Sequence, residues 1–263
     1  MKLSIITINR NNAEGLRKTI ESVVSQTYTD FEYIIIDGAS TDDSVDIIKE
    51  YADRITYWVS EPDTGIYNAM NKGILKANGE YLLFLNSGDL LCEKRTIENV
   101  YDKLNTYQIL FGYVVDDKGK VKDVPQEFSL RYLYYNNISH QAEFIKRDLF
   151  DRLGLYDESF KILADYKFNI SALMGTINVF YLNQCIAVVD NYGISNVNES
   201  QHLINIERDL IFKLLIPHGI MLDYKYWLNP RTFSNKSIVW LINNEKMFKV
   251  VRLIHKYFGN DYK

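Results

Sequence analysis

Short apolar runs alternate with polar loops and helical patterns through the first third of the chain. Four of these runs have the length of a buried strand and are too short for a core helix: Leu3–Ile8, Tyr33–Ile36, Ile55–Val59 and Tyr81–Leu85. After the first three runs, apolar residues recur at helical spacing, as in Leu16, Ile20 and Val23. Repeated strand–helix units predict an α/β fold with a mostly parallel sheet covered by helices.

The pattern changes beyond Asp89. Ile109–Val115 and Val121–Val124 flank an Asp-Asp-Lys-Gly turn and predict a β-hairpin. The helices expected next are Leu130–Tyr135, Arg147–Leu153 and Leu163–Leu173, and the expected strands are His140–Ile145, Ile177–Tyr181 and Cys185–Asp190. From Glu199 the pattern is helical, without a Gly-rich or Pro-rich linker. We therefore expect a main domain over residues 1–195 and a helical C-terminal extension over residues 196–263.

Carboxylates follow three successive predicted strands. Asp37 comes directly after the second strand, Asp63 lies in the loop after the third, and Asp89 lies beyond the fourth. Open α/β sheets bind ligands in the crevice outside the carboxyl ends of their strands. Because the three loops should meet at that edge, the sequence predicts one shared ligand site.

The stretch YLLFLNSGD, Tyr81–Asp89, joins a predicted strand directly to polar residues. A hard divalent cation that bridges phosphate oxygens needs only one or two protein carboxylates, so a single aspartate in this place is sufficient. The stretch predicts a metal or phosphate site, and an ordinary polar turn is the alternative.

Composition narrows the class of protein. The chain has 263 residues, of which 47% are hydrophobic and 24% charged, and these values exclude a disordered protein. Its formal net charge of -4 lacks the basic footprint of nucleic-acid binding, so no nucleic-acid partner is expected. No apolar run reaches the ~18 residues of a membrane span, and no signal-peptide pattern follows Met1. We therefore expect a cytoplasmic protein.

The two cysteines, Cys92 and Cys185, stand far apart in the sequence. They have neither the spacing of a metal site nor that of a disulfide framework. We expect two small buried side chains in a reducing compartment.

Three blocks of sequence carry a resemblance to a known family: SIITINR at Ser4–Arg10, QTYTDFEYIIIDGASTDDS at Gln26–Ser44, and SEPDTGIYNAMNKG at Ser60–Gly73. The first two resemble the opening strand and the most recognisable block of family 2 glycosyltransferases. The third resembles a subgroup of bacterial enzymes that build surface polysaccharides, including those of colanic-acid type. The resemblance covers roughly residues 1–195 and implies the GT-A fold, a Rossmann-like α/β architecture.

This resemblance implies an inverting transfer of a sugar from a nucleoside diphosphate donor, usually UDP-linked, to a saccharide or lipid-linked acceptor. Asp37 would accept a hydrogen bond from the ring N–H of the base, and acceptors placed against a base edge reject bases that leave them unpaired. Thr7 and Asn9 would line the same pocket, and Asp63 would lie against the nucleoside. The alternative for Asp37 is an Asx-turn or helix cap with the serine and threonine that follow it.

The metal motif of the family is Asp-x-Asp, and the corresponding residues of this chain are Asn86-Ser87-Gly88-Asp89. Only Asp89 keeps a carboxylate, and Asn86 is expected to contact the nucleotide sugar. The resemblance implies Mg²⁺ or Mn²⁺ on Asp89, with the diphosphate and waters as the other ligands. Such a cation would stabilise the charge that develops on the leaving diphosphate.

Asp165, in Ala164-Asp165-Tyr166, matches the catalytic base of the family, which removes the proton of the acceptor hydroxyl. Its alternative role is that of a favourable carboxylate at a helix N-terminus. His140-Gln141-Ala142 resembles the subgroup and would place His140 on the acceptor side, and a satisfied buried histidine is the alternative. Gly193-Ile194-Ser195 resembles a loop that closes over the donor.

Two other functions remain open at this point. A sugar-phosphate nucleotidyltransferase would need a Gly-rich loop after the first strand, and Asn9-Arg10-Asn11-Asn12 contains no glycine. A catalytically degenerate module that only binds a nucleotide sugar would fit the reduced metal motif, but the intact Asp165 favours an enzyme.

The last residues of the chain carry a basic amphipathic pattern. Basic side chains interleave there with apolar ones: Lys246, Lys249, Arg252 and Lys256 with Met247, Val250, Val251, Ile254 and Phe258. Such a helix could rest on the inner face of an anionic membrane, where lipid-linked acceptors lie. Packing of the same apolar stripe on the domain is the alternative.

Overall fold

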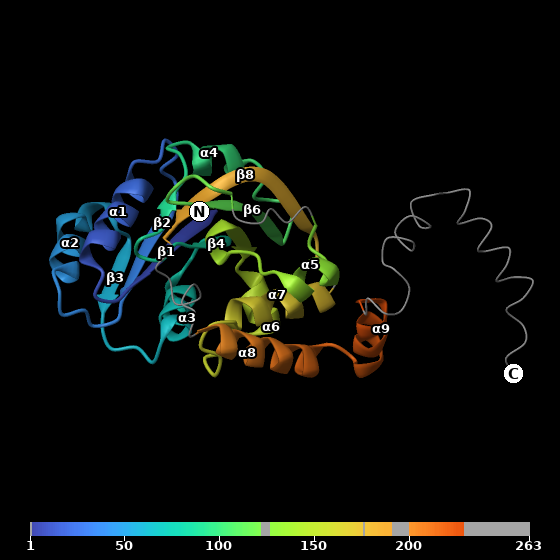
Figure 1. The fold of residues 1–263 in the computed structure, drawn as a ribbon. Coiled ribbons are helices and arrows are strands. Elements are labelled where there is room, and N and C mark those ends of the chain that lie inside the picture. The colour runs from blue at the N-terminus through green and yellow to red at the C-terminus, as the bar shows by residue number, and fades with distance from the viewer. Residues whose placement is uncertain (1, 122–126, 176, 191–199, 229–263) are drawn as a thin grey trace, which may run out of the picture. The chain divides into compact units, whose positions relative to one another are not determined.

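The computed structural model describes residues 2–121, 127–175, 177–190 and 200–228 (Figure 1). The strands are β1 (Leu3–Asn9), β2 (Glu32–Asp37), β3 (Tyr57–Ser60), β4 (Tyr81–Phe84), β5 (Leu90–Leu91), β6 (Ile109–Asp116), β7 (Glu143–Lys146) and β8 (Val179–Val189). The helices are α1 (Ala13–Val24), α2 (Ser44–Glu50), α3 (Ile66–Lys76), α4 (Thr96–Tyr101), α5 (Leu130–Tyr135), α6 (Asp148–Leu153), α7 (Ala164–Met174), α8 (Ser200–Leu215) and α9 (His218–Leu228). Short 3₁₀ turns lie at Ala52–Arg54 and His140–Ala142.

The strands form one sheet in the order β3-β2-β1-β4-β7-β6-β8-β5. Four neighbouring pairs are parallel (β1 with β2, β1 with β4, β2 with β3, β6 with β8), and three are antiparallel. Helices flank this sheet (Figure 1). The predicted α/β class with a mostly parallel sheet is therefore confirmed.

The strands β1 and β2 are buried along their whole length, as is typical of parallel strands covered on both faces. Leu3 and Ile5 of β1 belong to one core cluster with the apolar stripe Leu16, Ile20 and Val23 of α1. Helix α3 packs on β1 and β2. It does so closely at Gly73, where an added Cβ would lie 2.4 Å from Ile6 Cγ2. A side chain at this position would push the helix off the sheet.

Two predicted strands have a different form in the structure. Ile177–Tyr181 and Cys185–Asp190 are parts of one strand, β8, which bulges between them: the register passes from Phe111↔Tyr181 to Tyr113↔Cys185. Asn183 lies in this bulge with φ 48°, so the regular alternation of side chains is interrupted there. His140–Ile145 divides into the 3₁₀ turn and β7, which moves His140 and Gln141 out of the sheet. Of the predicted hairpin, the structure has β6 and a bridge from Val115 to Val121, while residues 122–124 lie outside the described part.

The compact unit that contains the sheet runs from Met1 to Asp209, and a second unit runs from Leu210 to Lys263. The expected boundary at residues 195 and 196 falls in a stretch that the structure does not describe, and the first ten residues of α8 belong to the sheet-containing unit. The basic segment over residues 246–258 also lies outside the described residues. Within the part of the chain that is described, no helix is long and apolar enough to cross a membrane.

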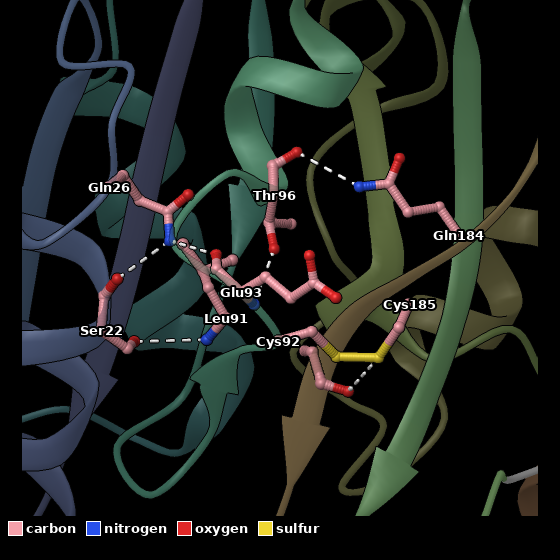
Figure 2. The surroundings of a disulfide bond; sticks show 9 residues. Ser22, Gln26, Leu91, Cys92, Glu93, Thr96, Gln184 and Cys185 are labelled. Atoms are coloured by element: carbon pink, nitrogen blue, oxygen red, sulfur yellow. Dashed lines mark hydrogen bonds between the residues drawn. A yellow bond between two sulfur atoms is a disulfide. The ribbon is translucent and has the colours of Figure 1, made fainter.

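The expectation of two unpaired cysteines is wrong. Cys92 and Cys185 are 93 residues apart in sequence and form a disulfide with a Cα–Cα distance of 6.1 Å (Figure 2). The cause is the pairing of β5 with β8, which places Leu91 opposite Ala187. Sequence spacing carries no information on this strand pairing, so the cysteine pattern gave no sign of the bond. The expectation of a reducing compartment, which was based on unpaired cysteines, therefore loses its support.

The disulfide should stabilise the oxidised protein. A crosslink over a loop of this length restricts the unfolded chain and typically contributes about 2–4 kcal/mol to the free energy of unfolding. We expect reduction of the wild type, or the double change Cys92→Ser and Cys185→Ser, to lower that free energy by this amount in urea titrations. The double variant should not respond to dithiothreitol, and identical curves for the oxidised and reduced wild type would contradict the stabilising role.

Candidate active site

Asp37, the last residue of β2, lies at the carboxyl edge of the sheet between the ends of β1 and β3. The strand register pairs it with Asn9 on one side and Ser60 on the other. Its Oδ1 accepts hydrogen bonds from Asn9 Nδ2 (2.7 Å) and Ser40 Oγ (2.6 Å), and its Oδ2 accepts from Ser40 N (2.9 Å) and Ser60 Oγ (2.6 Å). Asp37 thus forms the turn with Ser40 that was its alternative role. Its carboxylate has the four bonds that its lone pairs can accept.

Asp63 lies beside Asp37, as the strand-end pattern predicted. Its Oδ2 would be 2.2 Å from a Cβ placed on Gly38, so only glycine fits between these two acidic residues. The side chain of Asp63 is 6% exposed, lies 3.7 Å from Arg10 Nη1 and accepts a hydrogen bond from Gly65 N. The loops after β1, β2 and β3 therefore meet at one place.

Asn9 and Thr7, both on β1, have different positions relative to this edge. The Oδ1 atom of Asn9 is buried and has no hydrogen-bond donor among the described residues, so its capacity to accept a bond is unused there. Thr7 Oγ1 is instead hydrogen-bonded to Tyr33 OH (3.1 Å), and the residue is fully buried. The structure does not bring the side chain of Thr7 to the loop edge.

The loop Asn86–Asp89 is fixed to α1 by Thr19, a residue that the sequence analysis did not identify. Thr19 Oγ1 donates to the backbone oxygen of Asp89 (2.8 Å) and accepts from Gly88 N (2.9 Å). Gly88 has φ 104°, a value that favours glycine. The helix thereby sets the position of the Asp89 carboxylate.

Asp89 is 5% exposed, and burial raises the pKa of its carboxyl. Its Oδ2 accepts from Gln141 Nε2 (2.9 Å) and its Oδ1 from Asp190 N (3.1 Å), so a lone pair remains on each oxygen. Over the described ranges there is no group of three or more His, Cys, Asp or Glu side chains that could hold a metal ion. The single carboxylate of Asp89 fits a cation that takes its remaining ligands from phosphate and water.

The 3₁₀ turn His140–Ala142 joins Asp89 to Asp165. Gln141 reaches Asp89, and the neighbouring His140 has its Nδ1 atom 3.1 Å from Asp165 Oδ2. The other ring nitrogen, Nε2, is 3.1 Å from Asn86 Nδ2. Two consecutive side chains therefore connect the two carboxylates, and Asn86 contacts His140.

Asp165 lies in the first turn of α7 and is 5% exposed. The loop before it is held by Glu207 of α8, whose carboxylate accepts hydrogen bonds from the backbone N–H groups of Lys161 (2.6 Å), Ile162 (3.1 Å) and Leu163 (2.9 Å). Nothing in the sequence around Glu207 indicates this contact, which spans more than forty residues.

Two other acidic residues near α7 are not available as bases. Glu143 is 1% exposed and accepts from Asn169 Nδ2 (2.9 Å); burial, followed by the charge of Asp165, raises the pKa of Glu143 well above its usual range. Asp157 is paired with Lys167, whose hydrogen bond lowers the pKa of Asp157 to about 2. Burial favours the uncharged form of Glu143, and Lys167 holds Asp157 in an ion pair, so neither carboxyl is a strong candidate for a general base.

The sequence and the fold were compared with known proteins. Residues 4–158 match the family "Glycosyl transferase family 2". An uncharacterised glycosyltransferase of Mycobacterium tuberculosis (strain H37Rv) is 36% identical over 180 residues, which cover 65% of this chain and 69% of that protein. A PGL/p-HBAD biosynthesis glycosyltransferase of Mycobacterium bovis (strain BCG) is 33% identical over 198 residues, which cover 72% of this chain and 77% of that protein.

The fold is similar to two solved glycosyltransferase structures. The S. aureus TarS 1–349 complex with UDP-GlcNAc superposes with a TM-score of 0.66 at 17% identity, over 88% of this chain and 71% of that one. A mannosyltransferase from Pyrobaculum calidifontis in complex with GDP-Man and Mn²⁺ gives a TM-score of 0.61 at 17% identity, over 100% of this chain and 81% of that one. These likenesses confirm the GT-A fold, and the nucleotidyltransferase alternative is excluded by the family match. The chain belongs to glycosyltransferase family 2, and the protein is a glycosyltransferase enzyme.

Proposed function

We propose that the enzyme transfers a sugar, with inversion, from a nucleoside diphosphate donor to a saccharide or lipid-linked acceptor in the synthesis of a bacterial surface glycan. A UDP-linked donor, a divalent cation (Mg²⁺ or Mn²⁺) and a cytoplasmic site of action are parts of this proposal. Relatives support it by their names: one acts in PGL/p-HBAD biosynthesis, and TarS binds UDP-GlcNAc.

One observation carries the proposal: His140 and Gln141, adjacent in one 3₁₀ turn, bond to Asp165 and Asp89 respectively. An inverting displacement needs a base on one side of the anomeric carbon and stabilisation of the leaving group on the other. The turn holds a basic pair and a metal-binding carboxylate at neighbouring positions, which matches this requirement.

Each part of the site has a task in the proposed reaction. Asn9 and Asp63 at the ends of the parallel strands hold the nucleoside, and Asp37 fixes Asn9 through a 2.7 Å hydrogen bond, so that its role is to position the pocket. A cation on Asp89 would neutralise charge on the departing diphosphate. Asp165 would act as the base that removes the proton of the acceptor hydroxyl. The acceptor would enter beside His140.

A panel of nucleotide sugars tests the proposal directly. A ligand that binds only the folded state raises the melting temperature. We expect UDP-linked sugars to stabilise the protein more with Mn²⁺ than without it, and uncharged sugars to have no effect. Absence of stabilisation by every UDP-linked and GDP-linked sugar would contradict the donor class.

The role of Asp89 is tested by removing its carboxylate. We expect Asp89→Ala to abolish metal-dependent donor binding in calorimetric titrations, because no second carboxylate of the Asn86–Asp89 loop can replace it. Asn86→Ala is the matched control and should weaken donor binding less. Unchanged Mn²⁺-dependent affinity in Asp89→Ala would remove this residue from the metal site.

A further inference from the structure

A buried carboxyl with no task in the proposed reaction joins β7 to the helix that carries Asp165. Glu143, the first residue of β7, is 1% exposed. Its Oε1 accepts a hydrogen bond from Asn169 Nδ2 over 2.9 Å. Asn169 lies one helical turn after Asp165 on α7 and is fully buried. The Glu143–Asn169 pair therefore fixes the first turns of α7 against the sheet.

The other two polar atoms of this pair have no hydrogen-bond partner among the described residues. They are Glu143 Oε2 and Asn169 Oδ1, and both are buried. Such atoms are rare in native proteins, because the lost contact with water is not replaced. A carboxylate oxygen and an amide oxygen can only accept, so an ionised Glu143 leaves both atoms unsatisfied. A proton on Oε2 would turn one of the two acceptors into a donor.

We propose that Glu143 is a neutral carboxylic acid in the resting enzyme and that its Oε2–H group donates to Asn169 Oδ1. The acid and the amide then share two hydrogen bonds, Nδ2–H to Oε1 and Oε2–H to Oδ1, and both oxygens are satisfied. Glu143 is thus a positioning residue, which holds α7 in place without adding a negative charge beside Asp165. Its effect on the base Asp165 rests on the proposed function.

The groups that face the two carboxyls explain why only one of them carries a charge. Tyr156 faces both carboxyls and Tyr67 faces Asp165; both tyrosines are buried, and burial raises the pKa of each hydroxyl well above its usual range, so both are neutral. His140 is the partner of Asp165, and neither carboxyl is paired with a lysine or arginine in the described part of the chain. Like charges in a buried site disfavour each other, so the more deeply buried Glu143 takes the proton.

This arrangement keeps Asp165 available as a base. A negative charge on Glu143 would make Asp165 harder to deprotonate, because two neighbouring buried carboxylates repel each other. The rate of an enzyme with such a base falls at low pH, as the base becomes protonated. A neutral Glu143 therefore extends the activity of the enzyme to lower pH than an ionised Glu143 would.

The first test needs no substrate. Infrared spectra of the full chain at neutral pH separate the C=O stretch of a protonated carboxyl from that of carboxylates, and subtraction of the Glu143→Gln spectrum isolates the band of Glu143. We expect a protonated-carboxyl band in the wild type that is missing in Glu143→Gln. Equal bands in the two proteins would overturn the proposal, whatever the protein transfers.

Melting temperatures of two variants test the pairing with Asn169. The amide of Glu143→Gln can still accept from Asn169 Nδ2 and donate to Asn169 Oδ1, so this variant should melt near the wild type. Glu143→Leu is similar in size but leaves the amide of Asn169 buried without a partner, and it should melt at a lower temperature. Equal melting temperatures for the glutamine and leucine variants would contradict the positioning role.

The second test follows the pH dependence of UDP release from UDP-GlcNAc, or of GDP release from GDP-mannose, with water as acceptor. We expect Glu143→Gln to lose activity at the same low pH as the wild type, because a neutral group replaces a neutral group. A shift of this loss to lower pH would show that a charge had been removed and would overturn the proposal. Asn169→Asp adds a charge at the same place, and its loss of activity should shift to higher pH by roughly one unit. An unshifted profile in Asn169→Asp would overturn the effect on Asp165.

The outcomes separate the two proposals. Donor turnover by a wild type that lacks the infrared band would contradict the neutral Glu143 and leave the proposed function intact. Failure of the wild type to release a nucleoside diphosphate from either donor would contradict the proposed function alone, and the infrared experiment would still decide the state of Glu143.

Discussion

Asp165→Asn is expected to lower the transfer rate by about 10²–10⁴-fold while donor binding and the fold persist. The variant replaces one carboxylate oxygen by an amide NH₂ group. If this group takes the place of Oδ2, it faces His140 Nδ1 and Asn137 Nδ2, which now donate to that oxygen. The network can adapt, because the side-chain oxygens of Asn137 and Asn86 are buried and have no donor within the described part of the chain. Rotation of the two amide groups by about 180° would turn these oxygens toward the new N–H groups.

Donor affinity, melting temperature and turnover should be measured on the same preparation of Asp165→Asn. Near-normal turnover would remove Asp165 from the basic pair. A collapse in melting temperature with proportional loss of activity would instead assign Asp165 a structural role at the start of α7. The matched control is Asp157→Asn, which changes a carboxylate outside the reaction and should leave the rate unchanged.

Glu207→Ala is expected to cause the largest loss of stability. The change leaves three backbone N–H groups before α7 without their acceptor, and a buried unsatisfied group typically costs about 1–3 kcal/mol. Since these costs are not additive, we expect the free energy of unfolding to fall by roughly 3 kcal/mol or more in urea titrations.

The transfer rate of Glu207→Ala should fall together with its stability. Leu163, the last residue whose backbone N–H bonds to Glu207, is two positions before Asp165. Asp209→Ala, in the same helix and exposed, serves as control and should change stability by less than about 0.5 kcal/mol. Equal unfolding midpoints for Glu207→Ala and Asp209→Ala would contradict the anchoring role.

The first half of the site followed from sequence because it obeys a local rule. Each parallel strand ends in a polar loop, and all such ends meet at one edge, so Asp37, Asp63 and Asp89 could be placed before their contacts were known. The rule does not give the direction of a side chain. Thr7 lies on the same strand as Asn9, but its hydroxyl is hydrogen-bonded to Tyr33. The carboxylate of Asp37 accepts hydrogen bonds from Ser40 and Ser60.

The second half depends on contacts between distant segments, which a single sequence does not specify. His140 was expected in a strand, yet it lies in a 3₁₀ turn. Glu207 contacts the loop before α7 from a helix with ordinary composition. Cys92 and Cys185 meet only because β5, two residues long, pairs with β8. In each case the partner is set by the tertiary fold and leaves no periodic signal.

The stereochemistry of donor turnover tests the central claim most directly. Proton NMR should follow the sugar first released from an α-linked nucleotide sugar, with Mg²⁺ and the full chain, before the anomers equilibrate. The account predicts the β anomer, because a base on the side of His140 and Asp165 directs attack opposite the diphosphate. Release of the α anomer, or no release from any UDP-linked or GDP-linked sugar that binds, would contradict it.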